Sequence, residues 1–74
     1  MDVFDLADSI EKKEDFINFI DAFIDDFQKN KSEWENTDIE SFFSAMQRYC
    51  SDKKINEVSW KVFADILLGA SIYE

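Results

Sequence analysis

The side chains that most often carry out catalysis are scarce in this 74-residue chain. It contains no His, the commonest general base and metal ligand, and one Gly, too few for a glycine-rich phosphate loop. Its serines have no histidine to activate them, and its single Cys cannot belong to a zinc-binding Cys/His set. We therefore expect neither an enzyme nor a bound cofactor or metal ion.

Carboxylates are the remaining groups that could act together. Asp21 and Asp25 are four residues apart, which places them on one face of a helix, and Glu14 extends the row. Two such carboxylates could bind a divalent cation or share a proton. An exposed helical face, however, lacks the enclosed pocket that shifts a pKa. The pattern favours a solvated acidic face, with a binding face for a basic protein as the functional alternative.

The net charge of −9 lies entirely in the first half of the chain. Residues 1–40 hold thirteen acids against four lysines, whereas residues 41–74 hold four acids and four bases. Such a field repels nucleic acids and anionic membranes and attracts basic proteins. We also see no signal peptide and no apolar run of the roughly 20 residues that span a bilayer. We expect a cytoplasmic protein with a basic protein partner, and neither nucleic acid nor membrane as a ligand.

The composition predicts an all-α fold. Hydrophobic residues make up 46% of the chain, and it has no Pro and a single Gly, which disfavours tight turns and hairpins. We expect one domain, a compact bundle of about four helices with the last helix central. The predicted ranges are about 3–10, 13–29, 38–51 and 57–73 of the single domain 1–74. The second helix has the clearest apolar stripe: Phe16, Ile20, Phe23 and Phe27, widened by Ile17, Phe19 and Ile24.

The predicted helix ends carry capping residues. Asp2 could cap the first helix, Thr37 and Glu40 form a capping box for the third, and Asn56 or Ser59 could cap the last. The last helix is apolar around most of its circumference, which predicts burial on several sides or an oligomer contact. Gly69 within it costs about 1 kcal/mol relative to Ala, which suggests that a neighbouring backbone approaches closely there.

The aromatic residues are expected mainly in the core. Trp34 lies between helices and is flanked by Glu33 and Glu35. It either closes over the end of the core or is a partly exposed anchor in an acidic rim, as in an interface hot spot. Tyr73 is equally ambiguous. The predicted core residues are Phe16, Phe23, Phe27, Phe42 and Phe63, with Cys50 as a small core residue.

Two segments resemble a known family. The connection EWEN (Glu33–Asn36) and the ending SWKVFADILLGASIYE look like those of a family of small bacterial proteins known as domain of unknown function 7660. The resemblance extends over the whole chain, except between Cys50 and Ser59, where relatives carry a longer insertion with Gly and Tyr. It implies the helical fold and a bacterial origin, and it brings no activity, cofactor or site.

These observations favour a binding protein. The leading hypothesis is an immunity protein, or a similar inhibitor, that neutralises a basic nuclease-type toxin. The alternative is a regulatory or adaptor domain that acts through protein–protein or homo-oligomeric contacts of the last helix, and a nucleic-acid mimic is a weaker third. The predicted partner-binding residues are Glu14, Asp21, Asp25, Glu33, Trp34 and Glu35.

Overall fold

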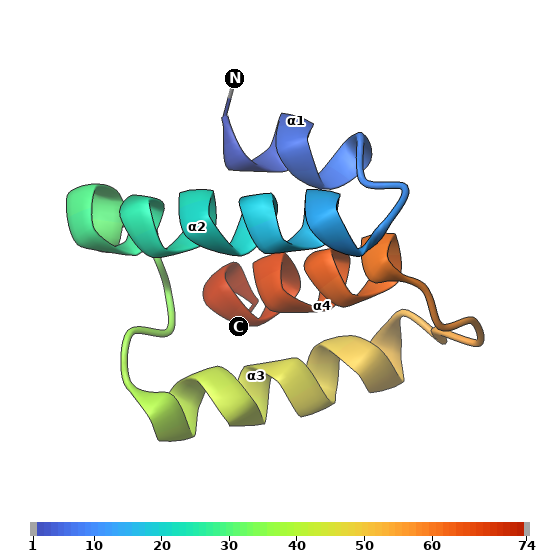
Figure 1. Ribbon diagram of the computed structural model, residues 1–74. Coiled ribbons are helices and arrows are strands. Elements are labelled where there is room, and N and C mark those ends of the chain that lie inside the picture. The colour runs from blue at the N-terminus through green and yellow to red at the C-terminus, as the bar shows by residue number, and fades with distance from the viewer. Residues whose placement is uncertain (1, 74) are drawn as a thin grey trace.

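The structure is a computed structural model that describes residues 2–73 (Figure 1). These residues form four α-helices, one short 3-10 helix and no strand, which confirms the predicted all-α bundle. None of these helices is long and apolar enough to cross a membrane. The elements are α1 (Val3–Asp8), α2 (Lys13–Asn30), η1 (Lys31–Glu33), α3 (Ile39–Asp52) and α4 (Trp60–Ile72).

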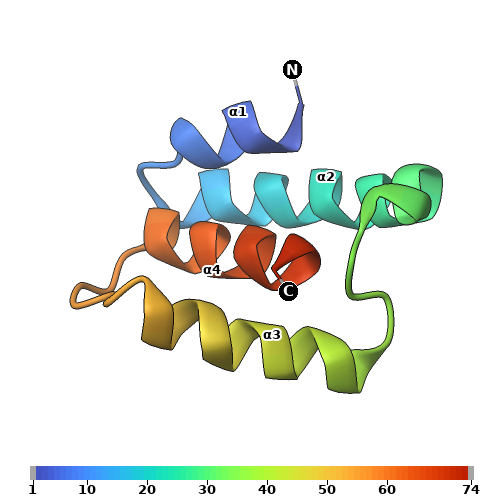
Figure 2. The same cartoon turned by 180° about the vertical axis from the view of Figure 1, so that it is seen from behind.

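Helix α4 is central, as predicted. It packs against α1, α2 and α3, and its contact with α3 is the most extensive in the molecule. Figures 1 and 2 show α4 between α2 and α3, and α1 packs against both α2 and α4. Helices α2 and α3 are thus held together mainly through α4.

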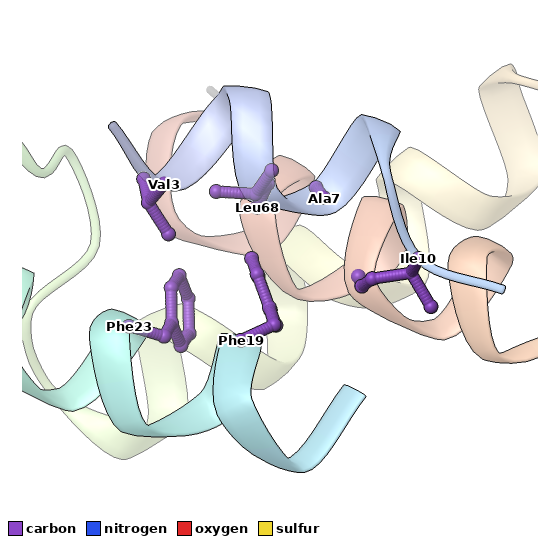
Figure 3. Packing of buried hydrophobic residues seen from close by; sticks show 7 residues of the cluster. Val3, Ala7, Ile10, Phe19, Phe23 and Leu68 are labelled. Atoms are coloured by element: carbon purple, nitrogen blue, oxygen red, sulfur yellow. The ribbon is translucent and has the colours of Figure 1, made fainter. Parts of the chain in front are cut away.

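The buried core lies where α1, α2 and α4 meet (Figure 3). Among residues 2–73, Phe19 is the one large side chain that is fully buried, and Phe23 follows it one turn along α2. Ile17 and Ile24, which were expected to widen the apolar stripe of α2, are exposed instead. The core cluster consists of Val3, Ala7, Ile10, Phe19, Phe23, Ala64 and Leu68.

The predicted burial of Phe63 is wrong, because 40% of its surface is exposed. Phe63 lies in the first turns of α4, where its ring and that of Trp60 pack against Phe16 at centroid distances of 6.3 and 5.3 Å. The apolar circumference of α4 is therefore not fully enclosed at its N-terminal end, where Trp60 is also exposed. Of the other predicted core residues Phe23 is buried, while Phe16, Phe27, Phe42 and Cys50 are half-buried.

The capping residues predicted for α1 and α4 are confirmed, and the one predicted for α3 is wrong. Asp2 and Ser59 accept hydrogen bonds from the backbone N–H three residues further on, as N-caps do. The cap of α3 is Asp38 and not Thr37: its carboxylate accepts from the backbone N–H of Ser41 at 2.8 Å and from the Ser41 hydroxyl at 2.9 Å. These bonds, the backbone one foremost, hold the pKa of Asp38 below its usual value. The N-cap is therefore one residue later than predicted, and the reciprocal bond expected from Glu40 is replaced by the one from the Ser41 hydroxyl.

Gly69 is approached by a side chain and not by the neighbouring backbone that was expected. The ring of Tyr49 lies flat over it, and a methyl group at Gly69 would be 2.6 Å from three ring carbons. The Tyr49 hydroxyl donates a hydrogen bond to Asp65 at 3.0 Å, and its ring packs at nearly a right angle to that of Tyr73. Burial, together with the bond to Asp65, raises the pKa of Tyr49 to about 12. The packing of Tyr49 on Gly69 and its bond to Asp65 thus join α3 to α4.

Candidate protein-binding surface

The predicted acidic row lies on the outer face of α2. Asp21 and Asp25 are exposed one turn apart, next to the polar side chains of Asn18 and Gln28. The Asp25 carboxylate is 3.2 Å from the Lys29 ammonium, and this is the only ion pair among residues 2–73. Because both side chains of that pair are exposed, water and salt screen it strongly. Within residues 2–73 the row therefore holds one loosely paired carboxylate, that of Asp25, and one without an ion-pair partner, that of Asp21.

Most carboxylates near the beginning of the chain face water in the same way. Within residues 2–40, all of them except Asp15 and Asp26 are exposed. Asp15 accepts from the backbone N–H groups of Glu11 and Lys12 and so satisfies the start of α2. In the described part of the chain, no three His, Cys, Asp or Glu side chains come together as a metal site requires. The arrangement is a dispersed negative surface.

Trp34 closes over the end of the core, as the first of its two interpretations predicts, and its role as an interface anchor stays a prediction. Its indole N–H donates to a carboxylate oxygen of Asp26 at 2.8 Å. Its ring centroid lies 4.8 Å from that of Phe23 and 5.0 Å from that of Phe27. The side chain is half-buried, while its neighbours Glu33 and Glu35 are exposed. Trp34 is thus fixed by α2 and shows only part of its surface to solvent.

The predicted binding residues do not form one patch. Glu14 is in the first turn of α2, and Glu33 follows its C-terminal end. An 18-residue helix is about 27 Å long, so these two carboxylates lie at opposite ends of the molecule's longest helix. The structure does bring Asp21 and Asp25 together, and it places Trp34 between Glu33 and Glu35 at the far end.

Asn36 is a key structural residue that the sequence did not reveal. It is buried, and its side-chain amide donates to the backbone carbonyls of Ala70 at 3.0 Å and Tyr73 at 2.7 Å. The backbone N–H groups of Glu35 and Asn36 both donate to the carbonyl of Ser71. The last carbonyls of a helix have no hydrogen-bond donor within the helix. Here the connection after η1 provides the donors for the carbonyls at the end of α4. A lone Asn between helices gives no sign of such a distant partner.

These two joined segments are the ones on which the family resemblance rests. The model of a family of unknown function (DUF7660) matches residues 12–74. The chain belongs to this family. The match starts just before α2, so it leaves α1 outside and does not extend over the whole chain as the resemblance implied. No curated protein and no solved structure matches.

The α1 helix nevertheless belongs to the core of this DUF7660 member. Val3 and Ala7 are buried against α2 and α4 although they precede the matched region. Within that region, Asn36 of the EWEN segment is bonded to Ala70 and Tyr73 of the ending. The two resembling segments therefore form one structural unit at the C-terminal end of α4.

Proposed function

We propose that this protein is a cytoplasmic, acidic protein-binding module, and specifically a bacterial immunity protein that neutralises a basic, nuclease-type toxin. The observation that carries the proposal is the exposed negative surface of residues 2–40, of which a single carboxylate, that of Asp25, is paired with a cation within residues 2–73. Unpaired surface charge destabilises a chain by self-repulsion, and a cationic partner would relieve that cost.

A nuclease is a suitable partner in chemical terms. Its active site must be positively charged because it binds phosphates, and an acidic inhibitor would gain speed and selectivity from that charge. The proposal gives the chain no catalytic step, because covering the toxin's active site is sufficient. The residues assigned to steering are Asp21 and Asp25, the adjacent pair on the outer face of α2.

The test begins with the protein encoded beside this chain, since an immunity protein is expected next to its toxin. That neighbour is purified and its cleavage of RNA and DNA is measured with and without an equimolar amount of the chain. Loss of cleavage is the expected result. A neighbour without nuclease activity, or cleavage that the chain leaves unchanged, would contradict the proposal.

The kinetic test changes charge at fixed positions. Asp21→Lys with Asp25→Lys should slow association by about tenfold at low salt and flatten its salt dependence. The matched control raises the net charge by the same four units on α3 and the loop after it: Ser44→Lys, Gln47→Lys and Glu57→Lys, all at exposed positions. If the control slows association as much as the α2 variant, the assignment to α2 is wrong.

A second candidate is a regulatory or adaptor domain that forms homo-oligomers. It is favoured by the exposed apolar side chains at the start of α4, where Val58 is 80% exposed beside Trp60 and Phe63. These three residues also line one shallow cleft with Ile10. Sedimentation at micromolar concentration separates the candidates, because a stable monomer excludes the homo-oligomer.

A further inference from the structure

An apolar hollow opens beside Trp34 at the end of the bundle. Its volume is about 230 Å³, which is room for one large side chain. We call it the Trp34 hollow. Almost all of its surface is carbon, because even its polar lining residues turn mainly carbon atoms toward it. The lining residues are Phe23, Phe27, Trp34, Asn36, Thr37, Asp38, Ile39 and Phe42.

The hollow results from unequal helix lengths. Helix α2 has 18 residues and α4 has 13, which correspond to about 27 and 20 Å. Figures 1 and 2 show the end of α2 and the start of α3 extending beyond the C-terminal end of α4. Helix α4 holds α2 and α3 apart, and the indole of Trp34 lies between their overhanging turns, against the rings of Phe27 and Phe42. The hollow is therefore built into the fold.

Two large apolar side chains are exposed at the edge of this hollow. Ile39 lines it and is 69% exposed, and Phe43, one helical turn further along α3, is 58% exposed. The ring of Phe43 meets that of Phe42, whose side chain lines the hollow, at 6.4 Å. The first turns of α3 thus continue the apolar surface outward, and that surface has no partner within residues 2–73.

The surrounding charge indicates what could cover it. Residues 31–43 carry four carboxylates and one lysine, a net charge of −3, and all four carboxylates are exposed. The lysine, Lys31, lies over the ring of Phe27 at 4.9 Å. A second copy of this chain or an anionic membrane would meet like charge here. A cationic partner with apolar side chains would be attracted by the carboxylates and could cover the apolar surface.

We propose that the Trp34 hollow, with Ile39 and Phe43, is the docking site for a basic amphipathic helix of the partner protein. One apolar side chain of that helix enters the hollow, its neighbours cover Ile39 and Phe43, and its lysines or arginines face the four carboxylates. This inference rests on the proposed basic partner and adds the class of element that binds and the surface that receives it.

The probe for this site is a synthetic helical peptide of leucine and lysine with one leucine face. The reference peptide replaces each leucine by serine and keeps the charge. Calorimetry should show the leucine peptide binding at least about tenfold more tightly, since burying one large apolar side chain is worth about that factor or more. Equal affinities at all salt concentrations would overturn the docking site.

Two variants locate the binding. Ile39→Ser and Phe43→Ser should each weaken the leucine peptide by about tenfold. The matched control is Ile17→Ser on α2, whose side chain is 56% exposed and away from the hollow. Because all three side chains are exposed, the variants should fold, as circular dichroism checks. Unchanged affinity in both α3 variants, or an equal loss in the control, would refute the location.

The outcomes separate this inference from the proposed function. If both peptides bind equally, and binding weakens with salt and with Asp21→Lys plus Asp25→Lys, the docking site is refuted and the acidic binding module stands. If neither peptide binds even at low salt, the preference for basic partners fails, and the docking site fails with it.

Discussion

Substitution of Gly69 by Ala tests whether the ring of Tyr49 fixes the α3–α4 contact. In an ordinary helix interior this change stabilises, because Ala is favoured over Gly by about 1 kcal/mol. Here the new methyl would lie 2.6 Å from three ring carbons, whereas non-bonded carbons prefer about 3.5–4.0 Å. The ring must therefore move by about 1 Å.

The cost of that movement follows from what holds the ring. The Tyr49 hydroxyl is bonded to Asp65, and the ring packs at nearly a right angle to that of Tyr73 with centroids 5.4 Å apart, so it cannot shift without losing contacts. Overpacking of this kind costs about 1–3 kcal/mol, and the hydrogen bond adds about 0.5 because water can replace it in part. After the gain in helix propensity, Gly69→Ala should lower the free energy of unfolding by roughly 0.5–2.5 kcal/mol.

The decisive measurement is a double-mutant cycle. In a Tyr49→Ala chain the ring is absent, so Gly69→Ala should raise the free energy of unfolding by about 1 kcal/mol, and the sign reverses. Urea denaturation followed by circular dichroism gives all four values, with a stabilising osmolyte in every sample so that the Tyr49→Ala chains fold. A stabilising Gly69→Ala in the natural chain, or the same effect in both backgrounds, would show that the ring does not restrict this position.

Two further changes test the other links between segments. Asn36→Ala removes the donor to the buried carbonyl of Ala70 and the half-buried one of Tyr73 and should cost about 1–3 kcal/mol of unfolding free energy. In urea denaturation Asn56→Ala, at an exposed position, is the control, and equal losses would contradict the role of Asn36. The Tyr49 pKa is raised from 10.0 to about 12, so the folded state holds this proton more tightly. The tighter binding of this proton stabilises the folded state fully below pH 10, and this stabilisation is lost as the pH rises towards 12. The midpoint of urea unfolding should therefore fall less steeply across this range in Tyr49→Phe, and parallel curves would refute the assignment.

The parts of the fold that the sequence predicted correctly are those set by local patterns. Helix α2 was placed to within one residue at its end because its apolar residues recur at helical spacing and polar residues fill the other face. The capping of α3 was missed by one position because Thr37 and Asp38 are adjacent and both can cap. Neighbouring candidates of this kind can be separated only by the backbone geometry.

Contacts between distant residues were not predictable in the same way. The apolar circumference of α4 was recognised, but periodicity does not say which neighbours cover it, so Phe63 was placed in the core. Asn36 binds Ala70 and Tyr73, which lie 34 and 37 positions further along the chain, and no rule of sequence spacing predicts such partners. The row of carboxylates was identified, whereas the hollow beside Trp34 depends on the relative lengths and packing of three helices.

In the proposed complex the two surfaces would control different steps of binding. The carboxylates of Asp21 and Asp25 act over a Debye length of about 8–10 Å, so changing them alters the rate of encounter. The hollow acts only on contact, so Ile39→Ser and Phe43→Ser should alter the rate of dissociation. Trp34 and Asn36 already fix the walls of the hollow through hydrogen bonds to α2 and α4, so binding there need not order the chain first. If the α2 variants slow association and the α3 variants speed dissociation, the partner engages both surfaces. If only association changes, the hollow has no role in binding.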